Sequence, residues 1–118
     1  MSDPRTAVEA HVAALNHGDL QAVLDTFTSD AVFSSDSGTV RGRAELAGLF
    51  DGVVGDRRPT TILRAATQDG ASLRCRLTRR FTVTDERGQV AAAHDVDVSA
   101  VFTVTGGAIS RVEVDPVA

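Results

Sequence analysis

Three polar side chains, His11, Arg79 and His94, fall on stretches whose other positions on the same face are apolar. An imidazole, with an ordinary pKa of about 6.5, can act as an acid, a base or a hydrogen-bond donor near neutral pH. An arginine does not lose its proton, so in a dry interior its guanidinium must meet a carboxylate, water or a ligand anion. Together these groups suit proton transfer next to a carbonyl, with a cation stabilising the oxyanion.

His11 lies in the segment "VEAHVAAL", which has the spacing of an amphipathic helix. Val8, His11, Val12 and Leu15 follow the i, i+3, i+4, i+7 pattern and therefore occupy one helix face. Two interpretations remain open for the imidazole. It is either a core histidine that is hydrogen-bonded to a backbone carbonyl, or a polar group that points into a pocket.

Arg79 and His94 lie in two long segments whose apolar residues recur with a period of two. The segment "SLRCRLTRRFTVT" has apolar residues at its odd-numbered positions except for Arg79, and "VAAAHDVDVSAVFTV" has them at its even-numbered positions except for His94. The intervening "DERG" predicts a turn that pairs Thr84 with Gln89. This register places Arg79 opposite His94 on the apolar face of two paired strands.

The opposite faces of the same two segments are polar. Arg74, Arg76 and Arg80 alternate along the first segment, and Asp95 and Asp97 alternate along the second. Opposite charges on paired strands stabilise each other. This pattern predicts a cross-strand charge ladder or a polar dimer interface.

The patterns along the chain predict helices first and strands afterwards. Pro4 fits the first position of a helix, Gly18 fits its end, and Asp19 fits the cap of the next helix. The expected helices cover residues 4–16, 20–27 and 43–54, and the expected strands cover residues 31–35, 60–68, 71–84, 89–104 and 108–115, with a loop or short strand at 38–43. Helices followed by an antiparallel meander indicate an α+β fold.

Length and composition limit the class of protein. A chain of 118 residues suits one domain, residues 1–118. The net charge of −4 and the lack of a long apolar run or signal-peptide pattern predict a cytoplasmic protein with no nucleic-acid and no membrane partner. Cys75 is the only cysteine, which excludes an internal disulfide, and the three histidines show no metal-ligand spacing. We therefore expect no metal and no cofactor.

The segment from residue 8 to residue 50 carries a family resemblance. Through "AALNHGDL", "SDAVF" and "GTVRGRAEL" it resembles the nuclear transport factor 2-like superfamily, and within it the SnoaL-like polyketide cyclases and the ketosteroid isomerases. The resemblance implies an α+β cone, in which a strongly curved antiparallel sheet and three helices enclose a cavity. It also implies a homodimer formed through the sheet.

The resemblance to ketosteroid isomerases assigns several positions one by one. His11 stands where those enzymes have a tyrosine that donates a hydrogen bond to the enolate, and Phe50 matches a supporting aromatic residue. Ser35 takes the place of the aspartate base, with Asp36 one residue later, and Ala100 takes the place of a protonated aspartate. Because none of the three chemical residues is retained, we do not expect steroid isomerisation.

These observations predict a site in an apolar cavity that takes a small apolar or partly anionic molecule. The expected catalytic residues are His11, His94, Arg79 and Asp36, the last only if a bulge turns it inward. The expected substrate-binding residues are Phe33, Ser35, Leu49, Phe50, Cys75, Leu77, Phe81, Val96, Val98 and Phe102. Cys75 has leucines as its same-face neighbours and is interpreted mainly as a small apolar filler.

Three functions remain open at this stage. The first is a cofactor-independent isomerase, cyclase or dehydratase, and the second is a non-catalytic ligand-binding or dimerisation module. The third and weakest is an epoxide hydrolase, whose Asp–Arg–Asp arrangement finds no inward aspartate in "RLTRRF" around Arg79. For Arg79 and His94 the alternatives to a catalytic role are a buried ion pair and a position at the rim of the sheet.

Overall fold

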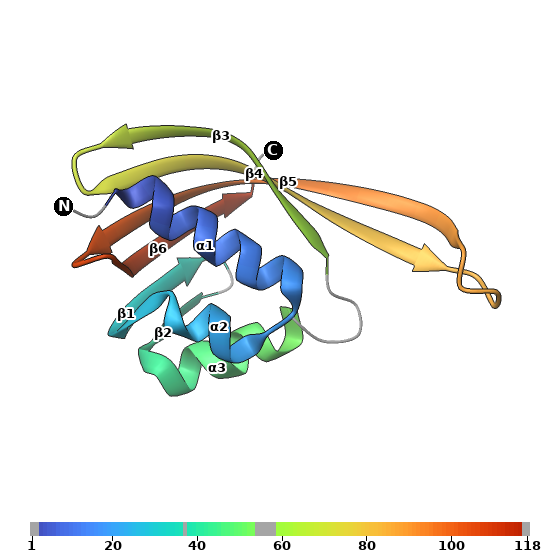
Figure 1. Cartoon of the computed structure of the whole chain (residues 1–118), viewed down its shortest axis with the longest axis horizontal. Helices are drawn as coiled ribbons and strands as arrows, with labels where there is room; N and C mark the ends of the chain where they lie inside the picture. The colour runs from blue at the N-terminus through green and yellow to red at the C-terminus, as the bar shows by residue number, and fades with distance from the viewer. Residues whose placement is uncertain (1–2, 37, 54–58, 117–118) are drawn as a thin grey trace.

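The computed structural model describes residues 3–36, 38–53 and 59–116, and in these ranges it contains three helices and one sheet of six strands (Figure 1). In chain order the elements are α1 (Pro4–His17), α2 (Leu20–Asp25), β1 (Phe27–Ser35), β2 (Gly38–Arg41), α3 (Gly42–Val53), β3 (Thr60–Asp69), β4 (Ser72–Thr84), β5 (Val90–Thr105) and β6 (Ala108–Pro116). Every predicted element is present. The main difference is that β1 begins at Phe27, within the stretch predicted as the end of the second helix.

The first helix begins and ends, and the second begins, where the sequence indicates. The Asp3 side chain accepts a hydrogen bond from the Arg5 N–H at 3.0 Å, and the helix ends at Gly18, whose φ of 77° lies in the left-handed region. Asp19 caps α2 by accepting from the Ala22 N–H at 3.2 Å. The short loop between these caps fixes the direction in which α1 leads into α2.

The sheet is mixed, which corrects the prediction of a wholly antiparallel sheet. Its strand order is β2-β1-β6-β5-β4-β3, and all neighbouring pairs are antiparallel except β1 and β6. In that parallel pair Val32 lies opposite Arg111 and Phe33 opposite Val112. The parallel pair arises because the meander β3–β6 returns to the sheet beside β1, running in the same direction. Alternation along each strand reveals its faces but not its neighbour.

The register of β4 and β5 also differs from the prediction. Thr84 pairs with Val90 rather than Gln89, and an irregularity next to this pair leaves Ala91 without a partner. From there on, Arg79 lies opposite Val96, and His94 lies opposite a phenylalanine two positions further along β4. A slip of two residues changes cross-strand partners and keeps the faces, because side chains alternate with a period of two.

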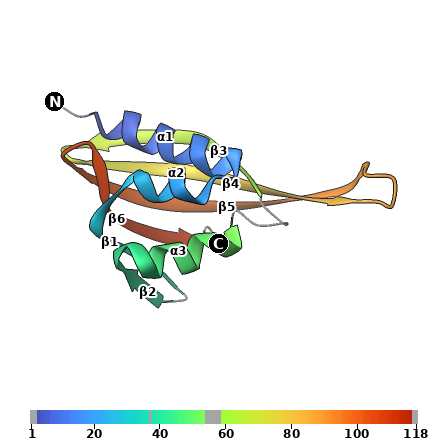
Figure 2. The same cartoon turned by 60° about the horizontal axis from the view of Figure 1, so that its bottom comes forward.

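The helices cover one face of the curved sheet, and the core lies between the helices and this face (Figure 2). Helix α1 packs against β3, β4, β5 and β6, and α3 packs against β1 and β2. The buried apolar residues are Val8, Ala14, Leu15, Val23, Leu24, Phe27, Ala31, Leu46, Phe50, Leu73, Cys75, Leu77, Val98, Ala100, Phe102, Val104, Ile109 and Val112. Among the described residues, no helix is both long enough and apolar enough to cross a membrane.

One end of the molecule is a two-stranded extension. Beyond the body of the sheet, β4 and β5 continue as a hairpin with no helix or third strand beside it (Figures 1 and 2). Every residue from 82 to 94 is exposed. We call residues 82–94 the arm.

Candidate functional site

His11 is a core residue in contact with aromatic rings. Its side chain is 3% exposed, although the position is polar. The imidazole makes edge contacts with Phe27, Phe50 and Phe102, at ring-centroid distances of 5.1, 5.7 and 5.8 Å. His11 thus shares the buried face of α1 with Val8 and Leu15, as its spacing predicts, and its hydrogen-bond partner is a side-chain hydroxyl rather than a backbone carbonyl.

Hydrogen bonding assigns the tautomer of His11. The Thr26 hydroxyl donates its only proton to the Val23 carbonyl at 2.6 Å, so toward His11 Nδ1, 3.0 Å away, it acts as the acceptor. His11 Nδ1 therefore carries the proton, and Nε2 carries the free lone pair. No described residue bonds to Nε2. Among the described residues, no side-chain nitrogen or oxygen is both fully buried and unpaired, so the unpaired Nε2 is accessible to water. Since His11 lines one cavity, Nε2 faces that cavity.

The His11 imidazole is neutral at physiological pH. Burial, and to a smaller extent the nearby charge of Arg79, lower the pKa of His11 from 6.5 to about 4. The Nε2 atom is consequently a hydrogen-bond acceptor and a weak base. It can accept a proton from an acidic hydroxyl, or from an acidic C–H bond between carbonyl groups.

Arg79 extends from β4 into the same cavity. Among the described residues it has no ion pair and no hydrogen-bond partner, although it is largely buried. Burial lowers the pKa of the guanidinium, which nevertheless stays charged because arginine does not deprotonate in proteins. The alternative of a buried ion pair is not observed among the described residues, and Asp36, the inward carboxylate that the proposal of a catalytic site needs, is exposed just after β1. Arg79 is thus a cation at the cavity, accessible to an anionic group.

The cavity itself is nearly closed. Its volume of about 20 Å³ is enough for about one water molecule and far below the several hundred Å³ of a typical ligand pocket. It is lined by His11, Val12, Leu15, Phe33, Phe50, Thr61, Leu77, Arg79, Val98, Ala100, Phe102, Val112 and Val114. Five of the predicted lining residues, Phe33, Phe50, Leu77, Val98 and Phe102, are therefore brought together.

A second, open pocket of about 180 Å³ adjoins the first. It is lined by Phe33, Ser35, Gly38, Thr39, Val40 and Leu49, which come from β1, β2 and α3. Phe33 lines both spaces and also packs edge-on against Phe50, with ring centroids 5.7 Å apart. Ser35 and Leu49 thus line this second pocket and not the cavity.

Several predicted site residues lie elsewhere. His94 is exposed on the arm and lies beside Phe81, with ring centroids 6.5 Å apart, so it does not join Arg79 at the cavity. Phe81 and Val96 are only partly buried and do not line the cavity. Cys75 is buried in the core, and burial raises the pKa of its thiol to about 11. The misplacement of His94 follows from the register and from the length of the hairpin beyond the helices.

An important contact near the cavity was missed by sequence reasoning. The Asn16 side chain accepts from the Thr61 N–H at 2.7 Å and donates to the Thr61 carbonyl at 2.9 Å. Because Thr61 lines the cavity, this pair of bonds fixes α1 against the start of β3 beside the site. The only indication in the sequence was that Asn16 lies outside the apolar face of the first predicted helix.

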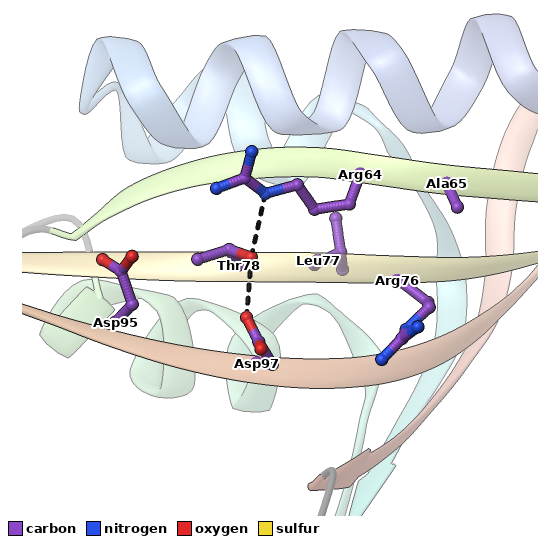
Figure 3. A pocket seen from close by; sticks show the side chains of 7 residues that line it. All are labelled: Arg64, Ala65, Arg76, Leu77, Thr78, Asp95 and Asp97. Carbon is purple, nitrogen blue, oxygen red and sulfur yellow. Dashed lines mark hydrogen bonds between the residues drawn. The ribbon is translucent and has the colours of Figure 1, made fainter.

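The outer face of the sheet carries a polar hollow of about 430 Å³ (Figure 3). Arg64 donates from Nε to the Thr78 hydroxyl at 3.1 Å, and Thr78 donates to Asp97 at 2.7 Å, so three strands are linked in one chain of hydrogen bonds. Arg80 forms a bidentate ion pair with Asp95 at 2.9 and 3.1 Å. Of the predicted charge ladder only the pair of Arg80 and Asp95 forms, because Arg74 and Arg76 lie opposite Val101 and Ser99. Arg64 is the extra residue of a β-bulge in β3.

Among the described residues, no group of three or more histidine, cysteine, aspartate or glutamate side chains is placed to hold a metal ion. The chemistry available at the cavity therefore consists of a neutral imidazole nitrogen, a guanidinium cation and an apolar wall. These polar groups suit contact with one acidic or anionic oxygen, and an organic ligand that carries it would require the cavity to enlarge.

The fold and this cavity define a small α+β protein whose curved sheet and helices enclose a potential ligand site. The model of the SnoaL-like domain matches residues 8–112, and the chain belongs to this family, within the nuclear transport factor 2-like superfamily. No functionally curated protein matches the sequence significantly.

Solved structures share the fold at low sequence identity. SalBIII, described as an epoxide hydrolase/cyclase-like enzyme in pyran ring formation of salinomycin, has a TM-score of 0.81 at 23% identity, over 97% of this chain and 90% of its own. A polyketide cyclase candidate from Xanthomonas campestris pv. campestris has a TM-score of 0.75 at 23% identity, over 95% and 88%. TerC, co-crystallised with polyporic acid, has a TM-score of 0.76 at 19% identity, over 94% and 88%. At these identities the similarity concerns the fold.

Proposed function

We propose that this protein binds a small, partly anionic organic molecule in the cavity and acts on it as a cofactor-independent isomerase, cyclase or dehydratase. The proposal rests on one observation: His11 Nε2 and the Arg79 guanidinium, neither of which has a partner among the described residues, line the same apolar cavity. An apolar pocket with a few convergent polar groups is typical of small-molecule sites. The activities named for SalBIII and the ligand of TerC agree with this class of molecule.

In this proposal the two polar groups divide the work. His11 Nε2 accepts a proton from a carbon next to a carbonyl, or from an enolic hydroxyl, and Arg79 stabilises the resulting oxyanion. Each pKa unit between proton donor and acceptor costs about 1.4 kcal/mol, so a base with a pKa of about 4 needs an acidic substrate. The hydroxyl of a hydroxyquinone has such acidity. The C–H bond between two carbonyl groups is less acidic than that hydroxyl, but far more acidic than the C–H bond of a simple ketone, and it depends more strongly on Arg79 to stabilise the oxyanion.

Ligand entry requires the cavity to enlarge, and Phe33 is the residue whose movement would do this. A rotation of its side chain would join the cavity of about 20 Å³ to the adjoining pocket of about 180 Å³. We therefore expect Phe33→Ala to increase the rate of ligand binding. Leu49→Ala, which enlarges only the outer pocket, serves as the matched control.

The second candidate is a non-catalytic ligand-binding module of the same fold. The small volume of the cavity favours it, because a site that holds one water molecule has no room for a substrate without rearrangement. Epoxide hydrolysis through an Asp–Arg–Asp arrangement receives no support, since Arg79 has no carboxylate partner among the described residues.

The test uses β-keto acids and hydroxyquinones as probes and measures both binding and proton transfer. Binding is measured by calorimetry, and proton transfer by NMR as exchange of the α-hydrogen of a β-keto acid for deuterium in D₂O. Arg79→Leu should weaken binding at least about tenfold, whereas Arg76→Leu, on the outer face of the same strand, should leave it unchanged. His11→Leu should abolish catalysed exchange, whereas His94→Leu should not.

The outcomes separate the two candidate functions. Binding that depends on Arg79 without catalysed exchange would support the binding module and reject the enzyme. If no probe binds, or if Arg76→Leu weakens binding as much as Arg79→Leu, the cavity is not the site and both proposals are wrong.

A further inference from the structure

The polar hollow on the outer face of the sheet is much larger than the cavity and contains charges that no ion pair neutralises. Its volume of about 430 Å³ lies in the range of small-molecule sites, whereas the cavity holds about one water molecule. Its charged residues are Arg64, Arg76, Asp95 and Asp97, of which Asp95 is paired with Arg80. The other three form no ion pair among the described residues, so two cations and one anion remain.

The β-bulge in β3 shapes this hollow. Leu63 pairs with Leu77 and Ala65 pairs with Arg76, so Arg64 is the extra residue between them. In a regular strand, neighbouring side chains point to opposite faces, but a bulge interrupts this alternation and redirects a side chain. Arg64 and Ala65 accordingly both line the hollow. Arg64 supplies a cation, and the small side chain of Ala65 leaves space opposite Arg76.

A buried hydroxyl holds two of the charged groups in place (Figure 3). Thr78 is only 3% exposed, accepts from Arg64 Nε at 3.1 Å and donates to Asp97 Oδ1 at 2.7 Å. These bonds leave the terminal nitrogens of Arg64 and the second oxygen of Asp97 without a partner among the described residues. Arg76 lies opposite Ser99 and is therefore the diagonal neighbour of Asp97. The hollow thus presents guanidinium N–H groups together with one free carboxylate oxygen.

We propose that the hollow is a second binding site, which takes a hydroxylated organic anion: a small carboxylate or phosphate ester with a hydroxyl on a neighbouring carbon. The anionic oxygens accept from Arg64 and Arg76, because guanidinium groups suit carboxylate and phosphate oxygens. The hydroxyl donates to the free oxygen of Asp97. Two arginines and one aspartate leave a positive charge in the hollow, which favours an anion. An anion without a hydroxyl would meet the Asp97 carboxylate unfavourably.

The surface around the hollow favours a small ligand over a protein partner. Stable protein interfaces have an apolar centre that is depleted of charged residues. The outer positions of β4 and β5 next to the hollow are polar, namely Arg74, Thr82 and Ser99. The two exposed large hydrophobic residues among those described, Val83 and Val90, both lie on the arm. A solvated face with a charged recess is therefore suited to a polar small molecule.

The first experiment titrates the isotope-labelled protein with glycerol 3-phosphate and with glycerate, and follows its NMR signals. Both probes should shift the backbone amides of Ala65 and Thr78 and the Nε–H signal of Arg64, and the shifts should saturate at millimolar concentration because the arginines are exposed. Inorganic phosphate, acetate and glycerol each carry only one half of the proposed ligand and should bind several-fold more weakly. The tighter of the two probes shows whether a phosphate ester or a carboxylate is preferred.

Four variants test the parts of the site, all at exposed positions where the chain should still fold. Arg76→Gln should weaken binding about fivefold, whereas Arg74→Gln, which removes the same charge two residues away on the same face, should leave it unchanged. Ala65→Leu fills the hollow without changing its charge and should abolish binding. Asp97→Asn removes the repulsion of a bare anion and should narrow the difference between glycerol 3-phosphate and inorganic phosphate.

Several results would overturn the proposal. One is the absence of shifts at Ala65 and Thr78 at tens of millimolar probe, or shifts confined to the residues that line the cavity. Another is equal weakening by Arg74→Gln and Arg76→Gln, which would show diffuse electrostatic attraction without a site. Equal affinity for glycerol 3-phosphate and inorganic phosphate would reject the role of Asp97. A dimer in sedimentation that Arg76→Glu dissociates would show that a second copy covers the hollow.

Discussion

The burial of His11 makes the stability of this protein depend on pH in a predictable window. The pKa of His11 is about 4 in the folded chain and close to 6.5 in the unfolded chain. Between these values the unfolded chain binds a proton that the folded chain excludes, so the free energy of unfolding rises with pH. The contribution is complete above pH 6.5 and is lost as the pH falls toward 4.

At pH 5 the magnitude follows from the two pKa values. The ratio of protonated to neutral imidazole is about 30:1 in the unfolded chain and about 1:10 in the folded chain. Unfolding is therefore favoured by a factor of about 30 relative to pH 7.5, which corresponds to about 2 kcal/mol. In a domain of this size that change lowers Tm by roughly 8 °C.

Urea unfolding at pH 5 and pH 7.5 measures this difference. The free energy of unfolding of the wild type should be about 2 kcal/mol lower at pH 5 than at pH 7.5, while that of His11→Leu should differ little between the two pH values. His94→Leu, which alters an exposed imidazole, should behave like the wild type. The lowered carboxyl pKa values of Asp25 and Asp95 fall below 3.8, outside this window. An equal loss in wild type and His11→Leu would refute the assignment of a neutral, buried imidazole.

Three further predictions concern single contacts. Asn16→Ala leaves the N–H and C=O groups of Thr61 unpaired beside the cavity and should cost about 2–3 kcal/mol in urea unfolding, with Asn16→Asp intermediate because it can still accept. Thr78→Val breaks the link to Asp97 on the outer face and should cost about 1–2 kcal/mol without changing ligand binding in the cavity. Cys75, whose thiol pKa burial raises to about 11, should react with a thiol reagent at pH 8 only at the rate of unfolding, and faster reaction would show that the core opens locally.

Much of the fold could be predicted because it rests on local signals. The Pro4 start and the Gly18 end of α1 follow from backbone preferences of these residues, and both are present. The faces of β4 and β5 follow from strict alternation, and over residues 72–83 and 92–103 a slip of two residues left them unchanged. The placement of Arg79 at the cavity, which was predicted from its face alone, is therefore correct although the predicted register is wrong.

The features that could not be predicted depend on which strands pair with each other and on how far the paired strands extend beyond the helices. Nothing in the alternation of β1 shows that it runs parallel to β6. His94 was predicted at the site because its face is correct, but its position along β5 lies on the exposed arm, opposite Phe81. The hydrogen bond from His11 to Thr26 joins residues 15 positions apart, and only the fold of α2 back onto α1 brings them together.

The two polar groups of the cavity influence each other, and this coupling bears on how a weak base could become useful. The positive charge of Arg79 is one of the two causes that lower the pKa of His11. A ligand anion at the guanidinium would compensate that charge and so raise the pKa of His11 in the complex. The same ligand would therefore be held by Arg79 and would strengthen the base that acts on it. Burial would still lower the pKa in the complex, so the substrate must be an acid in its own right.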